Sequence, residues 1–173
     1  MNVSKRVFLS WWLGGLAAFA IVLYLHGPLV IPSVPDGISA HQRAPDGATV
    51  DAIQHAWREA GLVETARIAM IGDFVFIGVF GLGCMLAGIH YRAKKGILLR
   101  GLGWLALIGG GVFVIADYAE TIAQFLQLSQ FSGDDLLAAL ASGFRPIKVA
   151  SWIAGFMAVA SALIVEGFLP QRA

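Results

Sequence analysis

One apolar segment constrains the fold of this chain most, because it is long enough to cross a bilayer and yet contains two acids. It runs from Gly101 to Leu128, and Asp117 and Glu120 lie toward its end. The core of a bilayer, about 30 Å thick, takes roughly 20 residues of helix. Charged side chains at membrane depth are costly, face the protein interior and usually meet a partner there. The segment therefore predicts a bundle of membrane helices, another of which supplies that partner.

Three further apolar segments complete the predicted bundle, over about 7–31, 63–90 and 146–169. Hydrophobic residues make up 58% of the chain and charged residues 13%, a balance typical of membrane proteins. A chain of 173 residues has room for four spans and one modest loop, so we predict a single integral membrane domain over 1–173. The predicted fold class is all-α, a four-helix transmembrane bundle. The first segment is too long for an ordinary signal peptide and is predicted to be an uncleaved anchor.

The stretch between the first two spans, 32–62, is the predicted external loop. After a second Pro-Asp-Gly turn, Thr49 can cap a short amphipathic helix that ends at Gly61. One face of this helix would carry Val50, Ile53, Trp57 and Ala60. We predict that it lies on the membrane surface, and that the loop histidines His41 and His55 are solvated.

Basic residues beside the spans predict the orientation of the protein. The strongest cluster follows the second span, and further basic residues lie near both ends of the chain; they are Arg92, Lys94, Lys95, Arg100, Lys5, Arg6 and Arg172. Because Lys and Arg are enriched in cytoplasmic loops, both termini are predicted to be cytoplasmic, in a bacterial inner membrane. The net charge of only +1 predicts no nucleic-acid partner. The predicted partners are the lipid bilayer and, as a further possibility, another membrane subunit or a second copy.

The start of the fourth span is ambiguous because of Pro146. Proline disfavours helical geometry at the residue before it. The segment after Asp135 is therefore either a short interfacial helix followed by a span, or one kinked helix. Ser132 and Asp135 have the spacing of a capping box at its start.

Polar residues in three of the spans form the candidate site. On the third span, Asp117, Glu120, Thr121 and Gln124 share one face. The second and fourth spans offer partners for it, namely Asp73, Arg67, Arg145 and Lys148. Three acids could be neutralised by three bases, which would make the cluster structural. The alternative is a polar pocket, open to the exterior, that binds a small solute, a lipid headgroup or a proton.

The sequence offers little for catalysis or for cofactors. The only cysteine, Cys84, lies in an apolar segment, which excludes an intramolecular disulfide and CxxC chemistry. A metal site formed by His26 with the three acids is conceivable by ligand type, but no HxxxH, HExxH or ExxH spacing supports it. No nucleophile or phosphate-loop motif is present. We therefore predict no cofactor and no metal.

Two stretches carry a resemblance. The segment from Asp51 through the second span, with Asp73 about two turns into it, resembles an uncharacterised family of small four-span bacterial membrane proteins. The sequence ADYAET resembles the D-x-x-E-N of their third span, with Thr121 in place of Asn, and Lys148 resembles a lysine near the start of their fourth. The resemblance implies the architecture and points to these residues, but it supplies no activity.

The leading functional prediction is a small non-enzymatic or accessory membrane protein whose charged cluster is structural. The first alternative is a protein that binds or transports a small solute or lipid headgroup at the cluster. The second is a membrane enzyme acting on a lipid or quinone. A water-accessible cavity lined by Asp73 and Asp117 would favour a ligand.

Overall fold

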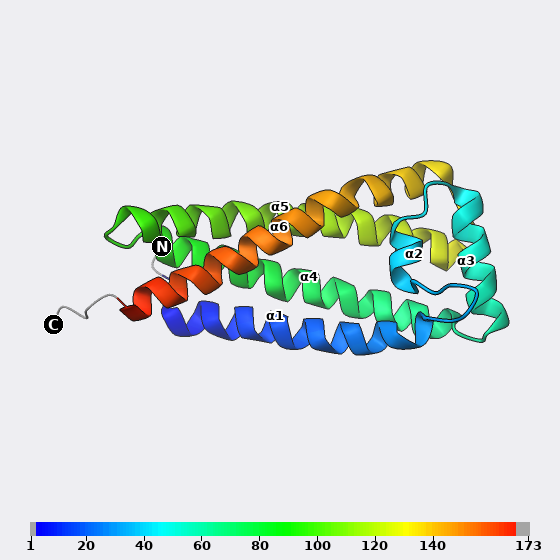
Figure 1. Cartoon of the computed structure of the whole chain (residues 1–173), viewed down its shortest axis with the longest axis horizontal. Helices are drawn as coiled ribbons and strands as arrows, with labels where there is room; N and C mark the ends of the chain where they lie inside the picture. The colour runs from blue at the N-terminus through cyan, green and yellow to red at the C-terminus, as the bar shows by residue number, and fades with distance from the viewer. Residues whose placement is uncertain (1–2, 169–173) are drawn as a thin grey trace.

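The structure, a computed structural model, describes residues 3–168 and contains four long helices that run the length of the molecule (Figure 1). These are α1 (Lys5–His26), α4 (Val63–Arg92), α5 (Ile97–Gln130) and α6 (Asp135–Phe168). Each is long and apolar enough to cross a membrane. Three short helices connect α1 to α4, namely η1 (Gly27–Leu29), α2 (Ile38–Gln42) and α3 (Gly47–Glu59). The chain is an all-α, multi-pass membrane protein, which confirms the predicted four-helix bundle.

The outer surface of the bundle is apolar, as a lipid-facing surface requires. Large aliphatic side chains from all four long helices are exposed, including Ile21, Ile71, Ile115 and Ile164. In water such a surface would be unfavourable, but lipid tails are as apolar as these side chains. The exposed residues therefore support the membrane assignment independently of helix length.

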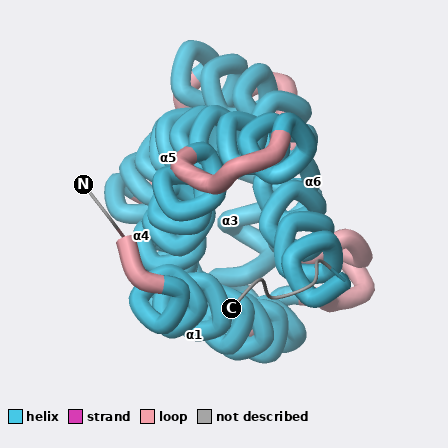
Figure 2. Tube along the Cα trace, turned by 90° about the vertical axis from the view of Figure 1, so that its left-hand side faces the viewer, coloured by secondary structure: helices cyan, strands magenta, loops and turns pink. Residues whose placement is uncertain are grey.

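The long helices pack in chain order, α1 against α4, α4 against α5 and α5 against α6, around a common axis (Figure 2). Helix α6 crosses the bundle obliquely, so it lies near α1 at one end and away from α1 at the other (Figure 1). We call the half where α1 begins and α6 ends the terminal half. The other half, covered by α2 and α3, is the cap half.

Glycines bring the helices of the bundle into close contact. A Cβ atom on Gly15 of α1 would lie 2.5 Å from the Cα of Phe80 in α4, and one on Gly83 would lie 2.6 Å from the backbone nitrogen of Trp12. In lipid, small residues at the interface allow this van der Waals packing between helices. Trp12 also stacks on Phe156, with 5.6 Å between the ring centroids, so α1 and α6 meet in the terminal half.

Helix α6 runs without a break from Asp135 to Phe168 with Pro146 inside it, so the single-helix alternative is the observed one. Its first turn is capped by Asp134, whose side chain accepts from the backbone N–H of Leu137 at 2.8 Å. Asp135 instead accepts from the N–H of Gly47, joining α6 to α3. The predicted pairing of Ser132 with Asp135 as a capping box is therefore wrong. Residue 169 and Arg172, used in the span and orientation predictions, lie outside the described residues.

The cap is formed mainly by α3, which crosses over one end of the bundle (Figure 1). Val50, Ile53 and Trp57 are buried as predicted, and the indole N–H of Trp57 donates to the carbonyl of Leu29 at 3.0 Å. The helix begins earlier than predicted, because Asp46 rather than Thr49 is the cap and accepts from the N–H of Thr49 at 2.8 Å.

The C-terminal end of α3 agrees with the sequence prediction, but one residue of the predicted apolar face is not buried. Gly61 has a φ of 71°, a left-handed conformation that suits glycine after a helix. Ala60 is exposed, although it was expected on the buried face.

His41 of α2 is buried in the cap, so the prediction that it is solvated is wrong. Its ring stacks on Trp57 with 5.5 Å between centroids, and its Nε2 lies 3.1 Å from the side-chain amide of Gln54. Burial lowers the pKa of His41 to about 4, because charging the ring without water is unfavourable. His55, on α3, is exposed as predicted.

Candidate functional site

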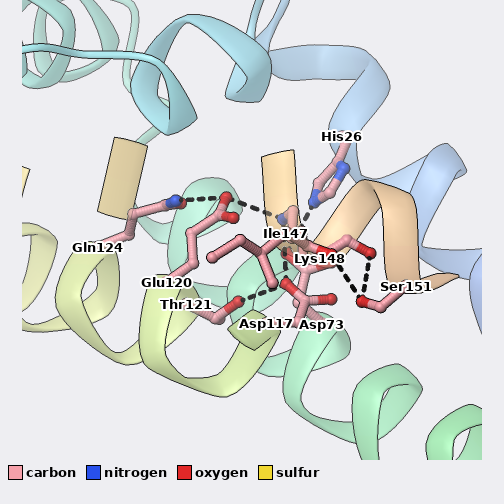
Figure 3. A network of polar contacts seen from close by, with 9 residues as sticks. All are labelled: His26, Asp73, Asp117, Glu120, Thr121, Gln124, Ile147, Lys148 and Ser151. Carbon is pink, nitrogen blue, oxygen red and sulfur yellow. Dashed lines mark hydrogen bonds and ion pairs between the residues drawn. The ribbon is translucent and has the colours of Figure 1, made fainter. Parts of the chain in front are cut away.

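Lys148 of α6 lies at the centre of a buried charged cluster. Its ammonium nitrogen is 3.0 Å from Oδ1 of Asp117 and 2.8 Å from Oε1 of Glu120, both on α5 (Figure 3). The side chains are almost entirely buried, with Glu120 fully so. The i, i+3 spacing of the two acids puts them on one face of α5, and α6 supplies the base opposite. One ammonium therefore serves two carboxyl groups.

Neighbouring polar side chains complete the hydrogen bonding of the two acids. Thr121 donates to Oδ1 of Asp117 at 3.4 Å, and Gln124 donates to Oε1 of Glu120 at 2.9 Å. Both partners come from the same polar face of α5, one turn further along. The second oxygen of Glu120 is buried without a partner among the described residues.

A second acid–base contact lies beside the first. Oδ2 of Asp73 on α4 is 3.1 Å from Nε2 of His26, the last residue of α1. Figure 3 shows His26, Asp73, Asp117 and Lys148 converging from four different helices. Each of these side chains is only slightly exposed.

A cavity of about 280 Å³ lies against the cluster in the cap half. Its polar lining comprises His26, Ser39, Gln42, Asp73, Asp117 and Lys148. The remaining lining is apolar, and two of its members, Leu23 of α1 and Val149 of α6, are 56% and 41% exposed. These two exposed residues extend the lining of the cavity to the surface between α1 and α6, which meets lipid.

Aromatic side chains form much of the apolar wall. Phe19, Phe76, Phe113 and Trp152 line the cavity. Phe19 contacts both Phe76 and Trp152, at centroid distances of 5.1 and 5.4 Å, and Phe76 meets Phe113 edge-on at 5.7 Å. The cavity is thus lined by both charged groups and aromatic rings.

Two of the predicted site residues lie outside the cluster. Arg67 pairs with Glu64, one turn away on α4, at 2.5 Å. Arg145 makes no ion pair with any described residue, and its buried Nε has no hydrogen-bond partner there. The expected balance of three acids by three bases is therefore not the observed arrangement.

Three further residues contribute to the site without having been predicted to do so. His26 was considered only as a metal ligand, although it is the partner of Asp73. Ser39 and Gln42, from α2, line the cavity, and no sequence pattern links them to the charged cluster. Within residues 3–168, no three His, Cys, Asp or Glu side chains gather closely enough to hold a metal ion.

A separate charged cluster lies at the end of the terminal half. Glu166 of α6 accepts from Lys5 of α1 at 2.6 Å and from the hydroxyl of Tyr91 at 3.1 Å, and lies 3.1 Å from Lys94. Both lysine side chains are well exposed. This cluster ties together α1, α4 and α6 at a water-accessible surface.

The fold and the site define a class: a multi-pass membrane protein whose four helices enclose a charged and aromatic cavity that opens sideways. Comparison of the chain with protein-family models, with curated proteins and with solved structures finds no match. The function must therefore be argued from the site itself.

Proposed function

We propose that this protein is a non-enzymatic integral membrane protein that binds a small amphipathic molecule in the cavity between α1 and α6. The observation that carries the proposal is that one cavity is lined by both Asp73 and Asp117 and opens between exposed Leu23 and Val149. Of the alternatives open from the sequence, this arrangement favours ligand binding over a purely structural cluster. Ion pairing alone would need no cavity.

The shape and lining of the cavity indicate the kind of ligand. Small-molecule sites usually occupy about 300–1,000 Å³ and combine apolar walls with a few placed polar groups. A volume of about 280 Å³ suits a polar head and a short apolar section. The rest of the molecule would lie in the lipid between α1 and α6. Ser39 and Gln42 of the cap would then border the polar end of the ligand.

We further propose that the protein lies in a bacterial inner membrane with both termini in the cytoplasm. The support is the placement of Lys5, Arg6, Lys94 and Lys95 at the same end of the bundle, since basic residues favour the cytoplasmic side. The cavity would then open in the outer half of the membrane. A transport role would require an oligomer, because four helices are few for a solitary transporter.

Native mass spectrometry of protein extracted gently from its own membrane tests ligand binding. The informative variant is Val149→Trp, which fills the mouth of the cavity from an exposed position. The matched control is Ile153→Trp, one turn further along α6, also exposed and not part of the lining. We expect a stoichiometric small-molecule adduct on the wild type and on Ile153→Trp, and its loss from Val149→Trp. Bare wild-type protein, or an adduct retained by Val149→Trp, would overturn the proposal.

A further inference from the structure

We infer that the ligand of this cavity carries a positively charged nitrogen, as a protonated amine or a quaternary ammonium, joined to an apolar body. The inference rests on the proposed function and names the chemical class that the site would select. It follows from the charges around the cavity, from the free carboxylate oxygens and from the aromatic wall.

The carboxyl groups around the cavity outnumber the basic side chains that contact them among the described residues. Three carboxyl groups, of Asp73, Asp117 and Glu120, lie in the cluster, and Lys148 is the one lysine that contacts any of them among the described residues. His26 adds a second cation only when it is protonated. Buried charge without a partner is strongly unfavourable, so either a proton or a cation from a ligand must balance the remaining carboxyl group, and a bound ligand cation would do so directly.

Lys148 cannot serve a ligand as a free cation. Its ammonium is already within 3.0 Å of Asp117 and 2.8 Å of Glu120. An anionic head entering the cavity would therefore meet carboxylates without gaining an unpaired ammonium. The arrangement disfavours sulfate, phosphate or carboxylate heads, because like charges placed together in a poorly hydrated site repel strongly.

Each of the two lining carboxylates retains an oxygen for a ligand. Asp73 contacts His26 through Oδ2, and its Oδ1 has no hydrogen bond to a described residue. Oδ1 of Asp117 accepts hydrogen bonds from Lys148 and Thr121, and Oδ2 of Asp117 likewise has no hydrogen bond to a described residue. Neither free oxygen is sealed inside the protein, since both residues line the cavity. Two carboxylate oxygens at one cavity are suitable acceptors for an ammonium group.

The aromatic wall favours the same ligand. The faces of Phe and Trp rings attract cations, and they do so more strongly where water is excluded. Phe19, Phe76 and Trp152 lie together on this wall and also offer apolar surface to the body of the ligand. A cation that leaves water for this cavity would meet carboxylate oxygens and ring faces.

The test measures binding of three probes with the same ten-carbon chain to the full-length protein in nonionic maltoside micelles. The probes are decyltrimethylammonium, decanol and decyl sulfate, and binding is followed by titration calorimetry. We expect saturable binding of the ammonium probe at least about tenfold tighter than that of decanol, with decyl sulfate weakest. Equal affinity for the ammonium probe and decanol would overturn the charge inference but leave the ligand site standing. Saturable binding of none of the three would overturn the proposed function as well.

Variants locate the effect. Asp73→Asn should weaken the ammonium probe by about tenfold and leave decanol unchanged. The control is Asp36→Asn, which removes an exposed carboxylate that pairs with Arg43 in the cap and is not part of the cavity lining, and it should change neither affinity. Unchanged ammonium affinity in Asp73→Asn would contradict the inference. If this variant fails to fold, the three-probe series on the wild type still decides the question.

Two sources could supply the nitrogen, a lipid headgroup or a free amphipathic amine. Competition against the bound ammonium probe separates them. Displacement by phosphatidylethanolamine and not by phosphatidylglycerol would assign the amine to a lipid, while displacement by neither would assign it to a free molecule. Equal displacement by both lipids would overturn the inference, because phosphatidylglycerol carries no amine.

Discussion

The two halves of the bundle are held together in different ways. In the terminal half, α1 and α6 meet through the stack of Trp12 on Phe156, and α1 approaches α4 closely at Gly83. In the cap half, the cavity lies between α1 and α6, and a buried charged cluster joins α5 to α6. The same four helices therefore enclose a cavity and a buried charged cluster in the cap half, whereas in the terminal half their buried contacts are close and apolar.

This difference indicates that the terminal half contributes mainly to stability and the cap half to the candidate site. Cavities and buried charges both reduce stability relative to a packed apolar core. Close packing against glycine, which occurs in both halves, can offset that cost. The comparison predicts that substitutions in the two halves act through different physical causes, which the following experiments separate.

The largest effect is expected when the base of the buried cluster is removed. Lys148→Met leaves Asp117 and Glu120 buried without their cation, which should lower the free energy of unfolding by about 3–5 kcal/mol. Unfolding in mixed micelles of increasing dodecyl sulfate content measures the change.

A compensated variant of the same cluster tests the physical cause. Adding Asp117→Asn and Glu120→Gln to Lys148→Met removes the unpaired charges and should restore most of the stability. Both acids must be changed, because the lysine serves both. If the triple variant is as unstable as Lys148→Met alone, packing around the lysine stem rather than charge holds this region together.

The cap should lose stability in mild acid because of His41. The unfolded chain takes up a proton on this residue near pH 6.5, whereas burial keeps the folded form neutral until about pH 4. The free energy of unfolding should therefore fall as the pH drops from about 6.5 to about 4, by at most about 3.5 kcal/mol, since one pKa unit corresponds to about 1.4 kcal/mol. Thermal unfolding at a series of pH values measures the slope.

Replacing two histidines in turn shows which residue causes this pH dependence of the free energy of unfolding. His41→Gln should flatten it, while the matched control His55→Gln, at an exposed position in the same cap, should leave it unchanged. A slope that survives in His41→Gln would place the acid sensitivity elsewhere, and the cap would no longer differ from the rest of the bundle in this respect.

Close helix packing should be sensitive to a single methyl group. A Cβ on Gly15 would lie 2.5 Å from the Cα of Phe80, so Gly15→Ala forces α1 away from α4 and should cost about 1–3 kcal/mol. At the adjacent Gly14 the nearest atom is Cγ1 of Val79 at 3.6 Å, an ordinary contact. Gly14→Ala should therefore be nearly neutral. Equal thermal unfolding midpoints for the two variants would contradict the close contact between α1 and α4.

The sequence alone was sufficient to predict the four-helix bundle and the residues at the centre of the charged cluster. Four long apolar segments predict four spans whatever their packing, because backbone groups in lipid must be hydrogen-bonded within a helix. The i, i+3 spacing placed Asp117 and Glu120 on one face of α5, and Lys148 was the nearest base on the next span. Local periodicity is enough for such a placement.

Features that depend on how the helices are oriented relative to each other were missed. Arg67 turns to Glu64 on its own helix, and Arg145 lies one turn from Lys148 without joining the acids. The oblique course of α6, which opens the cavity, has no signature in the sequence. Burial of His41 depends on the loop folding back over the bundle, and polar composition alone suggested the opposite.

The smallest effect is expected at the charged cluster of the terminal half, where the ratio of charges is reversed. There one carboxylate, Glu166, faces two lysines whose side chains reach water. Removing the charge of Glu166 therefore leaves no buried ion without a partner. Glu166→Gln keeps an oxygen that can accept from Tyr91 and should cost no more than about 1 kcal/mol, as exposed ion pairs do. The change should shrink further in concentrated salt, which screens exposed charges but not the cluster at Lys148. A loss of stability as large as that caused by Lys148→Met would mean that the difference in burial does not make the two clusters differ in energy. The contrast between the two halves would then be wrong.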